Sequence, residues 1–228
     1  DVRPRLGAPP ATDLAVYVHW PFCRSKCPYC DFNSEPSRGP LDVPAWRHAY
    51  ARQVASFRDL TGPRRTSSIF FGGGTPSLMP PALVGGIIAA IDTAWPLVDG
   101  AEISLEANPT SADRETFRAL RALGVDRLSL GVQALDDGAL RILGRRHSVA
   151  DALRSLEMAR SVLPAVSIDL IQGRPGQDIA AWRAELARVG PLALDHVSAY
   201  QLTIEPGTAF HRAGVAPCAE DLGADLYL

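Results

Sequence analysis

Cysteine is scarce in this sequence, and so are long apolar runs. Only four of the 228 residues are cysteine, too few for the disulfide framework that stabilises many small secreted domains. The apolar run VGGIIAAIDTAW, residues 84–95, is too short and too interrupted by glycine and aspartate to cross a bilayer. No signal-peptide pattern is present in the sequence. Together these absences predict a cytoplasmic protein without a transmembrane segment.

An excess of charge of one sign is lacking as well. The sequence has 23 Lys and Arg against 25 Asp and Glu, a net charge of -2 that is spread along the chain. The sequence has no basic patch that would predict nucleic-acid binding. It also has no basic amphipathic helix that would predict binding to a membrane surface. Small molecules are therefore the expected ligands. The length and the 46% hydrophobic content suffice for one large domain, preceded by a proline-containing, flexible lead-in at 1–13.

Strand and helix patterns alternate along the chain. Alternating or short apolar runs predict strands at 14–20, 67–72, 101–107, 126–132, 165–171 and 195–202. Helical patterns lie between them, at 43–57, 81–94, 112–124, 149–163 and 178–190. Such alternation predicts an α/β fold of parallel strands with right-handed crossovers, either a barrel or a doubly wound sheet. Six strand–helix units fit a partial or closed barrel best.

Helix boundaries and faces can also be predicted. Ser111 precedes an acidic first turn and is expected to cap a helix, while Gly124 and Gly190 stand at positions typical of helix ends. Trp182 and Leu186 fall on one face of the helix at 178–190, together with Val189. This face is expected to be buried.

Polar residues follow the predicted strands one after another. In a parallel barrel, functional groups gather at the carboxyl ends of the strands. The six predicted strands run into a cysteine-rich loop, the segment GGGTP at 72–76, Glu106 and Asn108, Gln133, Asp169, and finally Tyr200 and Gln201. A single polar residue at such a place is more often a cap or a turn residue. Six in succession predict a site.

The cysteine-rich loop has the spacing C-x3-C-x2-C, formed by Cys23, Cys27 and Cys30. A disulfide cluster would leave one thiol unpaired, because Cys218 lies far along the chain. A structural zinc site needs four protein ligands, and only His19 or Cys218 could supply the fourth. Ordinary four-iron clusters also take four cysteines. Three thiolates on a four-iron cluster would leave one iron open for another ligand, and we favour this interpretation.

Several motifs resemble those of a known family. CRSKCPYC resembles the C-x3-C-x-aromatic-C signature of the radical S-adenosylmethionine (radical SAM) enzymes. The remaining motifs resemble the oxygen-independent coproporphyrinogen III oxidase-like proteins, most closely their haem chaperone branch. Between residues 14 and 210, and in the family's order, they are YVHWPFC, CDFNS, FFGGGTPSL, SLEANP, RLSLGVQ, LGRRH, IDLIQGRPGQ and SAYQLTIEPGT.

The resemblance implies a fold and two cofactors. The fold is a partial (β/α)6 TIM-like barrel of the radical SAM type, over residues 14–210. A [4Fe-4S] cluster would be held by Cys23, Cys27 and Cys30, and S-adenosylmethionine (SAM) would chelate the open iron. In this superfamily an electron from the reduced cluster cleaves the sulfonium into methionine and a 5′-deoxyadenosyl radical. An external electron donor is therefore implied as a partner.

The resemblance also implies which residues contact SAM. An arginine suits the methionine carboxylate through paired hydrogen bonds, and an aspartate accepts from ribose hydroxyls. Bare glycine backbone allows a close approach, although a tight strand-to-helix turn would also explain the glycines. For the tyrosines, packing is an equal alternative. By resemblance the contacts are Tyr17, Tyr29, Gly72, Gly73, Gly74, Thr75, Glu106, Gln133, Arg145 (carboxylate) and Asp169 (ribose).

The branch of the family decides the expected function. Coproporphyrinogen III oxidases of this type carry a further cysteine two positions after the third, where this chain has Phe32. The resemblance therefore favours a haem chaperone that binds haem and delivers it to haem-accepting proteins, with oxidative decarboxylation of coproporphyrinogen III in porphyrin biosynthesis as the alternative. Gln172 and Arg174 depart from the family's usual D-L-I-Y-G-L-P-G-Q, next to Asp169. Residues 211–228 are expected to begin a connection to a C-terminal domain absent from this chain.

Overall fold

Six parallel strands form the framework of the molecule. A computed structural model describes residues 12–111 and 113–228; residues 1–11, which include most of the expected lead-in, and residue 112 lie outside the described residues. The sheet order is β1-β4-β5-β6-β7-β8, and every neighbouring pair is parallel. The strands are β1 (Leu14–Trp20), β4 (Thr66–Gly73), β5 (Leu97–Ala107), β6 (Arg127–Gln133), β7 (Ala165–Gln172) and β8 (His196–Gln201). The alternating sequence pattern thus gives the predicted partial TIM-like barrel.

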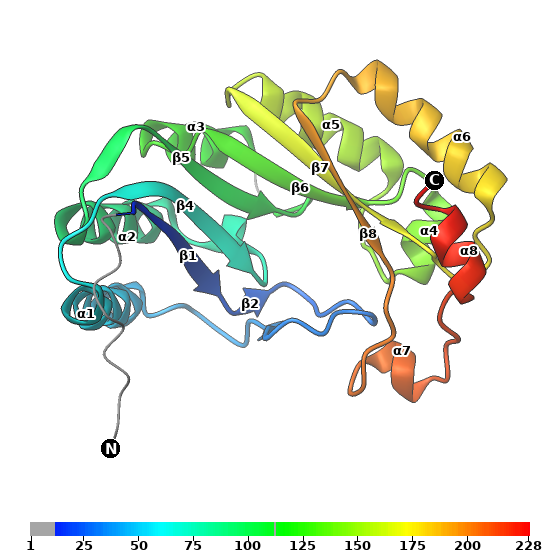
Figure 1. The fold of residues 1–228 in the computed structure, drawn as a ribbon, viewed down its shortest axis with the longest axis horizontal. Helices are drawn as coiled ribbons and strands as arrows, with labels where there is room; N and C mark the ends of the chain where they lie inside the picture. Colours follow the sequence, from blue (N-terminus) through cyan, green and yellow to red (C-terminus); the bar gives the residue numbers. More distant parts are fainter. Residues whose placement is uncertain (1–11, 112) are drawn as a thin grey trace.

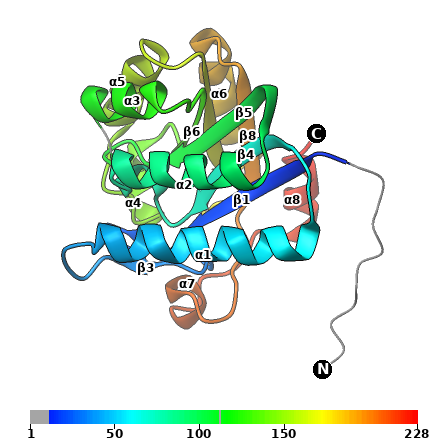
Figure 2. The same ribbon diagram turned by 90° about the vertical axis from the view of Figure 1, so that its left-hand side faces the viewer.

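Helices cover the outer face of this curved sheet (Figure 1). The longest, α1 (Val43–Thr61), lies beside α2 (Pro81–Ala94), as Figure 2 shows. The remaining helices are α3 (Arg114–Ala122), α4 (Asp137–Ile142), α5 (Val149–Arg160), α6 (Ile179–Val189), α7 (Ala209–Arg212) and α8 (Glu220–Asp225). Each of the five predicted helices is present, whereas the short α4, α7 and α8 were not predicted. A six-residue helix has too few turns to show a clear period.

The core lies between the strands and the outer helices. Side chains of β4, β5 and β6 pack against apolar residues of α2 and α3 in one cluster. Because successive residues of a strand point to opposite faces, Leu105 of β5 joins this core while its neighbour Glu106 points to the inner face. Among the fully buried members of the core are Ile69, Phe71, Leu83, Ile87, Ile91, Leu105, Phe117, Leu120, Leu128 and Leu130. The sheet can therefore carry a polar inner face without losing its core.

Two sequence-based details of the helices were wrong. Asp113, not Ser111, caps α3, because its side chain accepts from the backbone N–H of Thr116. Ser111 instead bonds to the backbone of Asn108. On α6, Leu186 is exposed and Glu185 is buried. A charged residue takes the inner position there because it has a partner, which periodicity alone does not reveal.

No helix in the described ranges combines the length and the apolar character that crossing a membrane requires.

Candidate functional site

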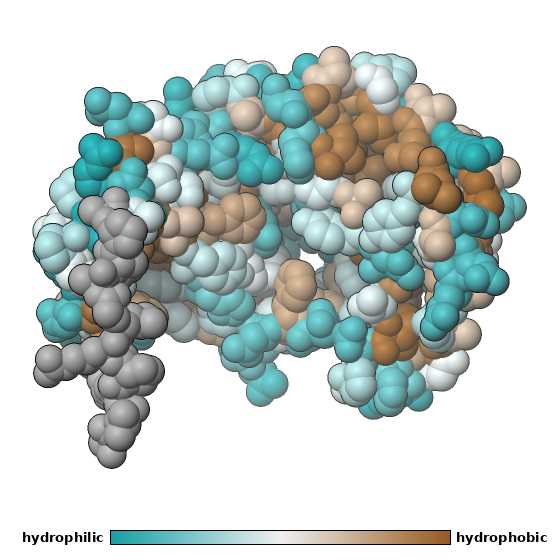
Figure 3. All heavy atoms as spheres, in the orientation of Figure 1, coloured by the Kyte–Doolittle hydropathy of each residue, from teal (hydrophilic) through white to brown (hydrophobic). Residues whose placement is uncertain are grey.

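A cavity of about 410 Å³ opens at the carboxyl ends of the strands. Figure 3 shows the molecule hollowed near its centre. Most of the residues expected to bind the cofactors line this cavity, and they come from four strands (β4, β5, β6 and β7), the cysteine loop and the α4–α5 connection. They are Cys23, Cys27, Cys30, Tyr29, Gly73, Gly74, Thr75, Glu106, Gln133, Arg145 and Asp169. Asn108, Tyr200 and Gln201, which follow predicted strands in the sequence, line it too.

The cysteine loop, residues 21–36, is fixed by hydrogen bonds of its own. Its two ends pair as the short strands β2 (Phe22–Cys23) and β3 (Glu35–Pro36). Within it, Lys26 Nζ donates to the carbonyls of Phe32 and Ser34, both at 2.9 Å. His19 Nε2, facing the carbonyl of Asn33 at 2.8 Å, must be the protonated ring nitrogen, because a carbonyl can only accept. The loop is thus shaped by contacts that need no metal.

Two glycines at the end of β4 allow the cysteine loop to lie against the sheet. A Cβ atom on Gly74 would stand 2.6 Å from the carbonyl oxygen of Phe22. One on Gly73, whose φ is +112°, would stand 2.7 Å from the His19 ring. Their backbone N–H groups are used as well, since Gly74 donates to Trp20 and Gly73 to Glu106 Oε2 at 3.1 Å. The glycines therefore seat the loop, and this packing accounts for them without any ligand.

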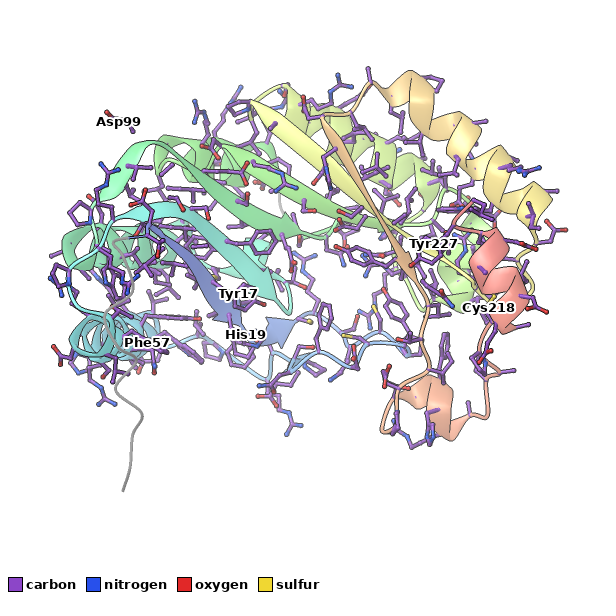
Figure 4. The ribbon with its side chains drawn as sticks, viewed as in Figure 1. Tyr17, His19, Phe57, Asp99, Cys218 and Tyr227 are labelled. Atoms are coloured by element: carbon purple, nitrogen blue, oxygen red, sulfur yellow. The ribbon has the colours of Figure 1, made fainter. Side chains whose placement is uncertain are left out.

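Tyr17 and Gly72 do not line the cavity. Tyr17 is 58% exposed and stacks on Phe70, with its hydroxyl 3.4 Å from His19 Nδ1. Figure 4 shows Tyr17 and His19 close together near the end of β1. A Cβ atom on Gly72 would meet the Tyr17 ring. The two residues therefore pack against each other beside the site.

Two carboxyl groups, Glu106 of β5 and Asp169 of β7, line the cavity from the strands on either side of β6. Burial and the nearby charge of Asp169 raise the pKa of Glu106 to about 7, although the N–H of Gly73 opposes this shift. Burial also raises the pKa of Asp169, against a hydrogen bond that Ser129 donates at 2.9 Å. The pair can accept hydrogen bonds from ribose hydroxyls or an ammonium group, and a cation between them would favour both carboxylates.

Arg145 connects the cysteine loop to β6. Its Nη1 lies 3.4 Å from the Sγ of Cys27, and its Nη2 donates to the carbonyl of Gly131 at 2.7 Å. Its Nε is buried without a partner in the described structure. Burial raises the pKa of Tyr29, which keeps that phenol neutral beside the arginine. Arg145 thus offers a spare donor and a positive charge to an anionic group in the cavity.

One of the two departures from the family pattern around the end of β7, Arg174, has a partner. Arg174 turns inward and forms a buried ion pair with Glu185 of α6. A second contact of this pair, from Arg174 Nη1 to Glu185 Oε1, measures 3.1 Å. Gln172 is also buried. The loop therefore leaves Asp169 at the cavity, where the sequence placed it.

The thiols fit a cluster better than the alternatives. All four cysteines are free, and Cys218 is absent from the residues that line the cavity. Within residues 12–111 and 113–228, no three His, Cys, Asp or Glu side chains are placed to hold one metal ion. Thiolates on a single zinc must converge at about 2.3 Å from it, whereas a four-iron cluster distributes three thiolates over three irons. A cavity beside the thiols, with the unpaired donor of Arg145, suits the larger group.

Some residues of the site were not identified from the sequence. Lys26 lines the cavity and fastens the cysteine loop, yet an exposed lysine in a motif carries no signal of its own. His147 belongs to no metal-ligand spacing in the sequence, yet it is buried and bonds to Val132 of β6. Glu185 lies outside the motifs, on the helix that follows IDLIQGRPGQ. Only its three-dimensional contacts show that it belongs near the site.

Comparison with known proteins gives concordant results. Residues 17–186 match the family model of the Radical SAM superfamily. The mouse protein "Radical S-adenosyl methionine domain-containing protein 1, mitochondrial" is 42% identical over 99% of this chain and 54% of its own length. "Heme chaperone HemW" of Haemophilus influenzae is 36% identical over 89% of this chain and 54% of its length. The chain thus spans about half the length of these curated relatives.

A solved structure is similar over the whole fold. Coproporphyrinogen III oxidase (HemN) from Escherichia coli superposes with a TM-score of 0.84 at 26% identity, covering 98% of this chain and 52% of that protein. Both the family match and the fold agree with the geometry of the cavity. The chain belongs to the radical SAM superfamily, within the HemN-like group that includes the haem chaperone HemW.

Proposed function

We propose that the cavity binds a [4Fe-4S] cluster on Cys23, Cys27 and Cys30, with SAM beside it. The free thiols, the open volume next to them and the family membership support this assignment. When bound, the two cofactors would supply reductive cleavage of the SAM sulfonium. Arg145 is assigned to the methionine carboxylate because its guanidinium faces the cavity with an unused donor.

The carboxyl groups are assigned to the other end of the ligand. Asp169 is held by Ser129 at a strand end, where it can accept from ribose hydroxyls. Glu106 is fixed by the backbone of Gly73 and is available to a cationic or hydroxyl group. Binding SAM, which carries an ammonium and a sulfonium charge, would lower the cost of ionising the two buried acids. The site would thus bind the cofactor better as the pH rises through 7.

We further propose that the protein to which this chain belongs is a haem chaperone. Phe32 is the observation that carries this proposal. It lines the cavity and is 57% exposed, so it stands at the mouth with neither a thiol nor a proton-transfer group. An oxidase step that depends on a cysteine at this position would be impaired. Relatives named as haem chaperones at 35–36% identity support the same assignment.

The alternative function is oxidative decarboxylation of coproporphyrinogen III. The high structural similarity to HemN favours it, since the two folds agree over almost the entire chain. However, one scaffold hosts many chemistries, and shared cofactor residues do not define a substrate. The chain covers only about half of that protein, so the residues for the tetrapyrrole can lie elsewhere in either case.

One experiment separates the two functions. Full-length, cluster-loaded protein is supplied anaerobically with SAM, a reductant and coproporphyrinogen III, and the tetrapyrrole products are followed over time. A parallel titration with haem is read by absorbance. Haem binding without turnover is expected, whereas repeated conversion to protoporphyrinogen IX would overturn the chaperone assignment. Phe32→Cys is a useful companion, because gain of turnover in this variant alone would identify the residue that separates the branches.

The subcellular localisation of the protein stays a prediction. We propose the cytoplasm, as the sequence suggests, although the mouse relative is named as mitochondrial. Fractionation of cells that express the full-length protein decides between the two compartments.

A further inference from the structure

The last residues of β6 leave the regular sheet. The pairing of β6 with β7 shifts register between Leu130 and Gln133. Gln133 has φ +71°, one of two non-glycine residues with positive φ in the described chain. A glutamine in this region is strained, and such a conformation persists only when its surroundings determine it strongly. Gln133 also lines the cavity, so the strain is located at the proposed cofactor site.

Two side chains hold the carbonyls before Gln133. Arg145 donates to Gly131 at 2.7 Å, and the His147 Nε2 lies 3.0 Å from the carbonyl of Val132. Burial and, to a smaller extent, the charge of Arg145 lower the pKa of His147 to about 4. The ring is therefore neutral, and its Nε2 carries the proton that is donated to Val132. These bonds replace part of the sheet pairing that the register shift removes.

Two side chains of α6 hold Leu135, two positions after Gln133. The backbone N–H of Leu135 donates to Glu185 Oε1, and its carbonyl accepts from Arg188. Glu185 is 5% exposed, and the charge of Arg174 neutralises it. Arg174 stands where the family pattern has leucine. A buried carboxylate bonded to a backbone N–H needs such a partner, because an unpaired buried charge is costly. Arg174 thus allows α6 to hold the β6 end through a carboxylate.

We propose that Arg174 and Glu185 are positioning residues that fix Gln133 in the orientation required to contact SAM. They do not touch the cavity themselves and act through the backbone of Leu135. The proposal rests on the assignment of the cavity as a SAM site. It predicts a thermodynamic coupling between Glu185 and Gln133, whose side chains belong to different elements.

A double-mutant cycle tests this coupling. Arg174→Leu with Glu185→Leu removes the ion pair and the acceptor for Leu135 while leaving no unpaired charge. In cluster-loaded protein, this variant is expected to weaken SAM binding about tenfold, measured by equilibrium dialysis. In a Gln133→Ala background, the same double change is expected to have little further effect. Equal losses in both backgrounds, or no loss in either, would overturn the proposal.

A matched variant separates the hydrogen bond from packing. Arg174→Leu with Glu185→Gln keeps an acceptor for Leu135, so it should bind SAM within about twofold of wild type. If it binds as poorly as the leucine pair, the hydrogen bond is not the link, and the proposal is wrong. Thermal unfolding of each variant shows that the comparison is made on folded protein.

Hydrogen exchange gives a readout that needs no cofactor. The amide of Leu135 is expected to exchange at least tenfold faster in the leucine pair than in wild type or in the glutamine variant. An unchanged exchange rate would contradict the proposal that Glu185 holds the backbone of Leu135. Failure of wild type to bind SAM would overturn the cofactor assignment instead, while the exchange result would still decide whether α6 holds this segment.

Discussion

The cysteine loop and the β6 end are held in different ways. The loop depends on glycine packing and on bonds to its backbone, most of them from residues within or next to the motif. The β6 end, residues 131–135, depends on charged or ring side chains from the α4–α5 connection and α6. Thus the hydrogen bonds of the loop are mostly local, although its packing on Gly73 and Gly74 is long-range, whereas the β6 end is held by polar side chains from other elements.

This difference has a physical origin. A loop whose bonds lie close together in sequence pays little chain entropy for each contact. The β6 end, in contrast, gives up regular pairing and carries strain, so it requires several partners at once. We therefore expect the loop to fail through steric changes and the β6 end to fail through loss of specific polar groups. Three predictions test this contrast and one concerns Glu106 of the neighbouring β5, in order from the largest expected effect to the smallest.

Gly74→Val should have the largest effect. Its side chain would meet the backbone of Phe22, which cannot move without displacing the loop. The iron and sulfide content after anaerobic reconstitution should fall to a small fraction of the wild-type content. Overpacking should also lower the free energy of unfolding by about 1–3 kcal/mol. Gly39→Val is the control, because nothing lies within 4 Å of an added Cβ there. Full cluster content in Gly74→Val would show that the close packing is dispensable.

Arg145→Met should mainly weaken SAM binding. The substitution removes the bond to Gly131 and the charge beside Cys27, yet leaves the three thiols in place. We expect a loss of affinity of tenfold or more, equivalent to at least about 1.4 kcal/mol, measured by equilibrium dialysis on cluster-loaded protein. The neighbouring, exposed Arg146→Met serves as the control. If both variants bind SAM equally well, Arg145 does not contact the ligand.

Glu106 should make stability depend on pH. Its pKa is raised from 4.5 to about 7, so between these values the folded state holds a proton that the unfolded state has lost. The free energy of unfolding therefore falls as pH rises from 4.5 to 7, by at most about 3.4 kcal/mol. Glu106→Gln should lack this component and should be more stable than wild type at pH 8.

Denaturant unfolding at pH 5 and pH 8 measures this effect. Glu157→Gln, an exposed change on α5, controls for loss of a carboxyl group. An equal pH dependence in wild type and Glu106→Gln would show that burial does not raise the pKa of Glu106.

Lys26→Met should have the smallest effect. It removes two bonds to loop carbonyls that are exposed or only partly buried, so water can replace the lost donor. We expect a loss of about 1 kcal/mol, read from thermal unfolding, and nearly unchanged cluster content. Arg38→Met, also an exposed change near the loop, is the control. A large loss of cluster would mean that one side chain, rather than the backbone, fixes the loop.

Much of the fold could be predicted because its signals are local. The six strands and five main helices follow from apolar periods within each segment, and their alternation dictates parallel pairing. The position of the cavity follows from the same rule, which is why residues as distant as Cys23 and Asp169 were expected at one edge.

The remaining features depend on contacts that sequence spacing does not encode. Leu186 was expected inside, but the pair of Glu185 with Arg174 places the glutamate there instead. The glycines at the end of β4 were expected to let a ligand approach, and the sequence did not show that their lack of a Cβ atom also makes room for Phe22 and His19. Tyr17 was expected at the cavity and lies beside it. Each difference concerns which neighbour a side chain meets, and that is decided by tertiary packing.

The most direct test of the account is the electron paramagnetic resonance spectrum of the reduced protein, recorded with and without SAM after anaerobic reconstitution. About four irons and four sulfides per chain are expected. The spectrum of the reduced cluster should change when SAM is added, and the cluster signal should be lost in Cys27→Ala. Stoichiometric zinc without sulfide, or a cluster spectrum that SAM leaves unchanged, would contradict the claim that the three cysteines and the strand ends form one cofactor site.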